Sequence, residues 1–253
     1  MKRVPPLVWF ALAYGLLLEA LLAPAILFWP EFSANLETLS SMAKAVPMVG
    51  EMLQSVEEQG LPAYVLGQHF FKGCNALGTA AAVLFAASAI AGEAHRGTLE
   101  MWLARPVSRT RLLLERWLAG ALALVVPVFL TTLTIPALLE RVEEYEPYAP
   151  YLLCAAHQSL FLLAVYSVTF LCSCLGSNPN RIALSLLFVT VFEFALYMVK
   201  SVTHWSLYRL CDMDLLLALA EDGRWNAPVV STLGATVVAS VALSWWVFQR
   251  RTP

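Results

Sequence analysis

The chain has 253 residues, of which 59% are hydrophobic and only 13% are charged, and its formal net charge at pH 7 is −2. A soluble domain carries roughly 25% charged residues, so this composition excludes a water-soluble globular protein and indicates a membrane protein. The length leaves room for about six spans of ~20 residues each, together with their connections.

The first apolar run covers about residues 7–29 and ends in a Trp-Pro pair, which is typical of a membrane interface. Lys2 and Arg3 precede it, as basic residues precede the apolar core of a signal peptide. The run is longer than such a core, contains Glu19 and lacks a small-residue cleavage site. It is therefore predicted to be a retained first span.

Residues 31–68 are mixed in character and carry apolar residues at helical spacing. They predict two short amphipathic helices, separated at Pro47 and ended by Gly60. These helices are expected to lie on the outer membrane surface or to cap the transmembrane bundle.

A second span is predicted at about 69–92. Gly78, Ala82 and Ala86 recur in it at four-residue spacing, and such small side chains let a neighbouring helix approach closely. A short interfacial or re-entrant helix is predicted at about 207–219. The four remaining spans are predicted at about 112–139, 151–175, 182–203 and 229–248. The fold class is therefore all-α: one polytopic transmembrane domain over residues 1–253, with six transmembrane helices.

The stretch 93–116 lies between the second and third spans and is nevertheless rich in charged residues. Gly97 can end the preceding helix, and Thr98 is a suitable N-cap for a new one. Glu100 then falls in the first turn, where a carboxylate suits the helix dipole. A short helix is therefore predicted at about 97–105.

This short helix has one apolar stripe, because Leu99, Trp102 and Leu103 fall at positions i, i+3 and i+4. Pro106 ends the helix, and Ser108 can cap the helix that follows. An amphipathic stub held between two breaks would lie along a membrane surface or against another protein.

The basic residues predict the orientation of the chain. If both termini are cytoplasmic, ten of the 16 Lys and Arg residues fall on the cytoplasmic side in short segments, and the other six are scattered over longer loops. The positive-inside rule favours this arrangement, which puts the stretch 93–116 in the cytoplasm. The ten residues are Lys2, Arg3, Arg96, Arg105, Arg109, Arg111, Arg116, Arg181, Arg250 and Arg251.

The stretch 93–116 resembles the signature of the ABC-2 type permeases, Glu-x3-Gly-Thr-Leu-x3-Leu-x2-Pro-x2-Arg, followed seven residues later by a basic residue. The resemblance implies that this stretch is a cytoplasmic coupling helix, which docks on a separate ATPase subunit. Glu100 and Trp102 are added to the docking set from the helix pattern. The matching positions are Glu93, Gly97, Thr98, Leu99, Leu103, Pro106, Arg109 and Arg116.

The resemblance also implies a multi-pass subunit of an exporter in a bacterial or archaeal cytoplasmic membrane. Its expected partners are an ATPase subunit, a second permease subunit and the lipid membrane, with no nucleic acid. The chain contains no Gly-x4-Gly-Lys-Ser/Thr phosphate loop, so it is expected not to be an enzyme and to bind no cofactor. ATP and Mg would be held by the partner subunit.

Two further implications of the resemblance concern the ends and the sides of the bundle. The first and fifth spans are expected near the interface between two permease subunits. Such permeases usually begin with a basic amphipathic helix, whereas here six residues precede the first span. How the amino terminus contacts the ATPase subunit therefore stays open.

Two carboxylates fall within predicted spans, Glu19 in the first and Glu193 in the fifth. A charge at mid-bilayer costs at least ~2.5–3.5 kcal/mol, so each should face the bundle interior, be protonated or find a partner. Both are candidates for a polar substrate path. Equally, each could be a protonated carboxyl that is hydrogen-bonded between helices.

These carboxylates also leave open a second function, that of a proton-coupled secondary transporter, although no inverted repeat is evident. A third possibility is a membrane scaffold without transport activity. Cys172 and Cys174 offer sulfur ligands that would suit Cu(I). Cysteines are also ordinary packing residues of apolar segments, so no metal site is predicted.

Overall fold

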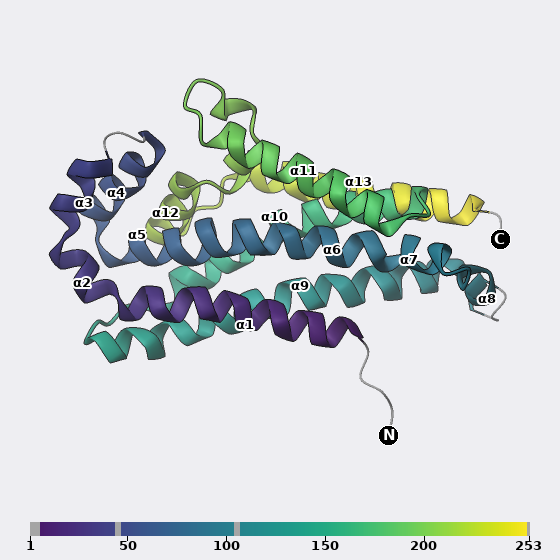
Figure 1. Cartoon of the computed structure of the whole chain (residues 1–253), viewed down its shortest axis with the longest axis horizontal. Coiled ribbons are helices and arrows are strands. Elements are labelled where there is room, and N and C mark those ends of the chain that lie inside the picture. Colours follow the sequence, from purple (N-terminus) through teal and green to yellow (C-terminus); the bar gives the residue numbers. More distant parts are fainter. Residues whose placement is uncertain (1–5, 44–46, 104–106, 252–253) are drawn as a thin grey trace.

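The protein is described by a computed structural model that covers residues 6–43, 47–103 and 107–251. The side chains of residues 41–43, 47–49, 51, 102 and 103 are left out of that description. The described residues form helices and connecting turns, with no strands among them. Figure 1 shows the long helices running side by side along one axis, with both termini at the same end.

Within the described residues, six helical segments are long and apolar enough to cross a membrane. The predicted all-α, polytopic fold is thus confirmed. The six segments are α1 (Pro6–Leu27); α5 (Leu61–Leu66), η1 (Gly67–Gly78) and α6 (Thr79–Ala89) together; α9 (Arg109–Leu139) with η2 (Glu140–Val142); α10 (Tyr148–Leu175); α11 (Pro179–Tyr197); and α13 (Ala227–Arg250).

Two of these segments differ from the predicted spans by more than three residues at one limit. The second begins at Leu61 instead of residue 69, because residues 61–67 are helical and mostly buried in the bundle. Gly60, with a φ of +68°, makes the sharp turn before it. The fifth ends at Tyr197 instead of residue 203, since the chain then turns into short 3-10 segments.

At the end opposite the termini, three short helices cover the bundle: α2 (Trp29–Ala34), α3 (Leu36–Ala43) and α4 (Pro47–Gln59). Two of them are the predicted amphipathic helices, whereas α2 was not predicted. Trp29, the first residue of α2, is buried, and its indole N–H donates to Glu144 at 3.2 Å. The Tyr64 hydroxyl donates to the Ala25 carbonyl at 2.9 Å, which ties α5 to α1.

The core lies along α10, which packs against α6, α9 and α13. The predicted small-residue face of α6 is part of this packing, because Ala82 and Ala86 are fully buried. A Cβ atom on Gly78 would lie 2.8 Å from Leu162 Cδ1, so a larger residue there would force the Leu162 side chain to move. One turn further along α10, Gly120 of α9 faces Tyr166 in the same close manner.

The segment between α11 and α13 enters the bundle as η3 (Thr203–Trp205), η4 (Leu207–Cys211) and α12 (Met213–Asp222). A buried polar chain holds it: Cys211 Sγ donates to Gln158 Oε1 at 2.7 Å, and Gln158 Nε2 donates to Asn75 Oδ1 at 2.8 Å. The predicted re-entrant region at 207–219 is thus formed by η4 and α12, and Cys211 links it by hydrogen bonds to α10 and, through Gln158, to η1.

The sides of the bundle are formed by helices that bury little of their surface. Of the residues of α11, only Tyr197 is buried, and α1 and α13 bury four residues each. Their outward faces are apolar, with Leu16 and Phe188 about 70% exposed. Such faces suit lipid or another transmembrane helix.

Candidate functional site

The chain breaks its helix at Ile90, between α6 and α7 (Ala91–His95). The Ser173 hydroxyl of α10 lies at this break. Its oxygen accepts from the N–H groups of Ile90 and Ala91 at 3.1 and 2.9 Å, and it donates to the Ala87 carbonyl at 2.9 Å. Ser173 therefore satisfies the backbone groups that the break leaves unpaired.

Helix α7 ends at Gly97, as the sequence predicts. Gly97 has a φ of +68°, and its N–H donates to the Ala94 carbonyl at 3.1 Å. The next N–H, that of Thr98, reaches back to the Glu93 carbonyl at 3.0 Å. This pair of bonds is a Schellman motif, in which the left-handed position favours glycine.

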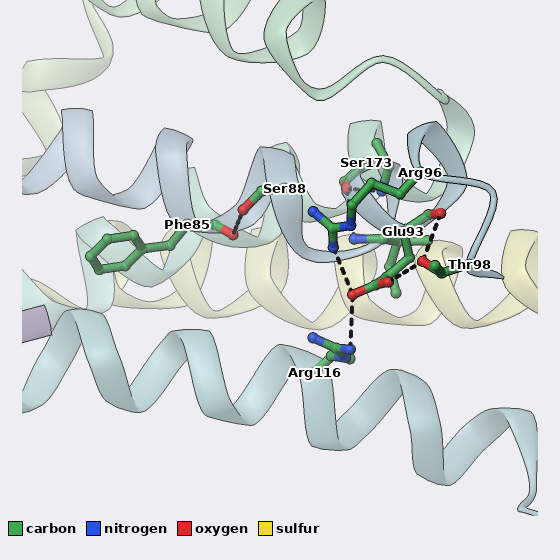
Figure 2. A network of polar contacts seen from close by, with 9 residues as sticks. Phe85, Ser88, Glu93, Arg96, Thr98, Arg116 and Ser173 are labelled. Carbon is green, nitrogen blue, oxygen red and sulfur yellow. Dashed lines mark hydrogen bonds and ion pairs between the residues drawn. The ribbon is translucent and has the colours of Figure 1, made fainter. Parts of the chain in front are cut away.

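Glu93 is the centre of the polar contacts at this end of the bundle (Figure 2). Its Oε1 atom lies 2.9 Å from Arg96 Nη2 and 3.2 Å from Arg116 Nη2, and its Oε2 atom accepts from the Thr98 hydroxyl. The Glu93 side chain is only 11% exposed. One carboxylate thus joins α7, the turn before α8 (Leu99–Leu103) and α9.

The surroundings of Glu93 keep it ionised. Burial raises the pKa of this carboxyl, but the Thr98 hydroxyl and the guanidinium groups of Arg96 and Arg116 together outweigh burial and hold the pKa below its ordinary value. The negative charge of Glu93 is therefore a permanent part of the site near neutral pH.

Helix α8 turns its first residue inward. Leu99 is 7% exposed and belongs to the hydrophobic core, whereas Glu100 and Met101 are exposed, Met101 to 64%. Leu99 was predicted as a docking residue, but here it attaches α8 to the bundle. The side chains of Trp102 and Leu103, and all of Pro106, lie outside the described residues.

Met101 and Ser173 are functional candidates that sequence reasoning missed. Met101 lies off the apolar stripe on which the prediction relied, so the helical pattern gave no reason to choose it. Ser173 stands between Cys172 and Cys174, which drew attention as possible metal ligands. Within the described ranges, no group of three His, Cys, Asp or Glu side chains is placed to hold a metal ion.

Ser108 caps α9 as predicted, because its hydroxyl oxygen accepts from the Arg111 N–H at 3.2 Å. The next residue, Arg109, makes an unpredicted contact. Its Nη1 atom donates to the carbonyls of Gln249 and Arg251 at 2.9 and 2.7 Å. The guanidinium of Arg109 thus lies at the carboxyl-terminal end of α13, where the helix dipole favours a cation.

A second arginine repeats this arrangement one helix further on. Arg251 donates to the carbonyls of Cys174 and Gly176 at 2.9 and 3.2 Å, at the carboxyl-terminal end of α10. Arginines therefore connect α9 to α13 and α13 to α10 at the end of the bundle that carries α8. Arg111 instead forms an exposed pair with Glu115.

The structure does not bring the two predicted intramembrane carboxylates to one place. Glu19 contacts Thr134 of α9. Glu193 accepts from the Leu207 N–H at 2.9 Å, and its backbone carbonyl accepts from the Ser206 hydroxyl at 2.7 Å. The Glu193 contacts support an anchoring role for this carboxylate at the start of η4.

Comparison with known proteins adds one finding. The model of a family described as an ABC-2 family transporter protein matches residues 12–208. The matched part begins in α1, ends in η4 and includes the whole stretch 93–116. No curated protein matches the chain.

Proposed function

The chain belongs to the ABC-2 family of transporter proteins, and from this we propose that it is the permease subunit of an ATP-driven exporter. The proposal assigns ATP and Mg to a separate ATPase subunit, because the sequence has no phosphate-binding loop of its own. The observation that carries it is the geometry of α7 and α8, a short element with an exposed outer side that is joined directly to α6, α9 and α10 and, through α9, to α13.

Three connections lead from this element directly into the bundle, and a fourth leads on from α9. The chain itself continues into α6; Glu93 reaches α9 through Arg116, and Ser173 reaches α10. Arg109, at the start of α9, adds α13. A displacement of α8 by a closing ATPase subunit would therefore move packed helices as a body, without a long loop to absorb it.

The proposed docking surface consists of exposed residues of α8 and of the turn before it. Among the described residues, Arg96, Glu100 and Met101 are exposed there. The sequence adds Trp102 and Leu103, since large apolar residues often dominate such contacts. Charges at the rim would set the orientation of the partner.

This proposal predicts that Met101→Asp lowers the amount of ATPase subunit that co-purifies with the chain by at least about tenfold, or ~1.4 kcal/mol. The reason is that a charge would replace an exposed apolar contact. The measurement is pull-down of the partner ATPase subunit with the chain. Tyr145→Asp, an exposed residue in the loop after η2 at the other end, is the matched control. Wild-type recovery and transport with both Met101→Asp and Trp102→Ala would contradict the proposal.

We further propose that both termini and α8 are cytoplasmic. Figure 1 places these three parts at the same end of the bundle, and the arginines concentrate there.

In intact cells, a thiol reagent that cannot cross membranes should label Tyr145→Cys and should leave Ser177→Cys unlabelled until the cells are opened. The native cysteines would first be replaced. Both positions are exposed and lie just outside the two ends of α10, at opposite ends of the bundle. Labelling of Ser177→Cys from outside would show the opposite orientation.

The remaining partner in the proposal is a second permease subunit, either a copy or a relative of this chain. The nearly unburied apolar face of α11 supports this assignment, since it is free to pack on another transmembrane helix. The proposed substrate path uses Glu19, whereas Glu193 keeps the anchoring role at the start of η4.

A further inference from the structure

A groove runs between α1 and α9 on the side of the bundle. Its volume is about 690 Å³, within the range of small-molecule sites. Its walls are almost entirely apolar, and several of them are exposed, including Leu16 at 70% and Leu130 at 58%. The polar side chains that line it come from Glu19, Thr131 and Thr134.

Glu19 has too few hydrogen-bond donors for a carboxylate. The Thr134 hydroxyl lies 3.1 and 3.0 Å from its two oxygens, but the same hydroxyl lies 2.7 Å from the Thr131 carbonyl. One hydroxyl hydrogen can serve only one of these acceptors, whereas a carboxylate offers about four acceptor positions. Among the described residues, no basic side chain forms an ion pair with Glu19.

A single negative charge in an apolar groove at membrane depth favours a positively charged ligand. A charge in this setting is costly unless a counter-charge accompanies it. The walls favour an apolar ligand body, and the carboxylate favours a cation with weak hydration. We propose that this groove binds a hydrophobic cation, with its positive group at Glu19 and its apolar body between α1 and α9.

The depth of Glu19 argues against a phospholipid headgroup as the cation. Glu19 lies eight residues before Leu27, the last residue of α1, which is about 12 Å along the helix. A headgroup would have to carry its phosphate that far into the apolar region. A hydrophobic cation without a phosphate does not meet this obstacle.

The inference rests on the proposed transport function only in that the ligand would then be cargo. Binding itself requires neither nucleotide nor the ATPase subunit. If the chain binds the cation but does not transport it with ATP, the proposed function is contradicted and the proposed binding site is not.

The test uses the full chain in lipid nanodiscs without nucleotide. Tetraphenylphosphonium and tetraphenylborate serve as probes, because they have nearly the same shape and opposite charge. The wild-type chain should bind the cation, and Glu19→Gln should weaken that binding by at least about tenfold while binding of the anion does not weaken, because its repulsion by Glu19 is removed. Glu140→Gln, an exposed carboxylate in η2, is the matched control and should bind as wild type does.

A second variant protects the test against misfolding. Leu16→Trp enlarges an exposed wall residue and should block the groove without disturbing the core, so cation binding should fall at an unchanged melting temperature. The proposal is overturned if wild type binds both probes equally, if it binds neither, or if Glu19→Gln and Leu16→Trp both keep wild-type affinity for the cation.

Discussion

Glu93→Gln is expected to reduce ATP-driven transport by at least about tenfold while the chain still inserts into the membrane. The change removes the charge that holds Arg96 and Arg116, so α7 and α8 would no longer move together with α9. Hydrogen bonds to charged groups contribute about 1.5–3 kcal/mol each, so a measurable loss of stability is also expected. Vesicle transport assays and thermal unfolding in detergent would measure the two effects separately.

The pH dependence of this variant tests the same contact in a second way. The folded-state pKa of Glu93 lies below its ordinary value of 4.5, so the ionised carboxylate stabilises the fold above that pH. This contribution is lost as pH falls through the folded pKa. The difference in melting temperature between wild type and Glu93→Gln should therefore be full near neutral pH and shrink below about pH 4.5.

The control for both measurements is Glu115→Gln. Glu115 makes the same kind of pair, with Arg111, but at the surface, where ion pairs contribute little. It should leave transport and melting temperature nearly unchanged. If Glu93→Gln transports as wild type does and its melting temperature is unaltered, Glu93 is not part of the coupling path.

Gly120→Ala is expected to have the largest effect on stability. A Cβ atom at this position of α9 would overlap the Tyr166 hydroxyl and lie 2.8 Å from Tyr166 Cζ. Tyr166 is fully buried, and its hydroxyl donates to the Trp117 carbonyl at 3.1 Å. The ring therefore cannot retreat without losing that bond, and a loss of about 3 kcal/mol or more is expected.

The measurement is the yield and melting temperature of the purified chain by fluorescence-detected size exclusion. Gly234→Ala in α13 is the matched control, because no heavy atom lies within 4 Å of a Cβ atom placed there. It should be neutral, or stabilise by up to about 1 kcal/mol, as alanine does in a helix. If Gly120→Ala is as stable as wild type, the close approach of α9 and α10 is wrong.

The sequence by itself was enough for the features that depend on neighbouring residues. Six apolar stretches of membrane length predicted the spans, since apolar length is what crossing a bilayer requires. Gly97 and Ser108 were assigned their roles correctly, because a helix end is decided within about four residues. The signature around Glu93 led to the ABC-2 family, which the family match then showed.

Only the tertiary structure decided which partners those residues have. Leu99 faces the core and Met101 faces outward because α8 is attached through Glu93 and Arg116, which lie 23 positions apart. The dipole at the start of α9 disfavours a cation such as Arg109, but the end of α13, about 140 residues later, supplies carbonyls for it. Ser173 and the groove at Glu19 likewise arise from helices that meet across the bundle. Periodicity and capping are local properties, whereas hydrogen-bond partners and cavities depend on which helices pack together, and that is set by the shapes of all their side chains at once.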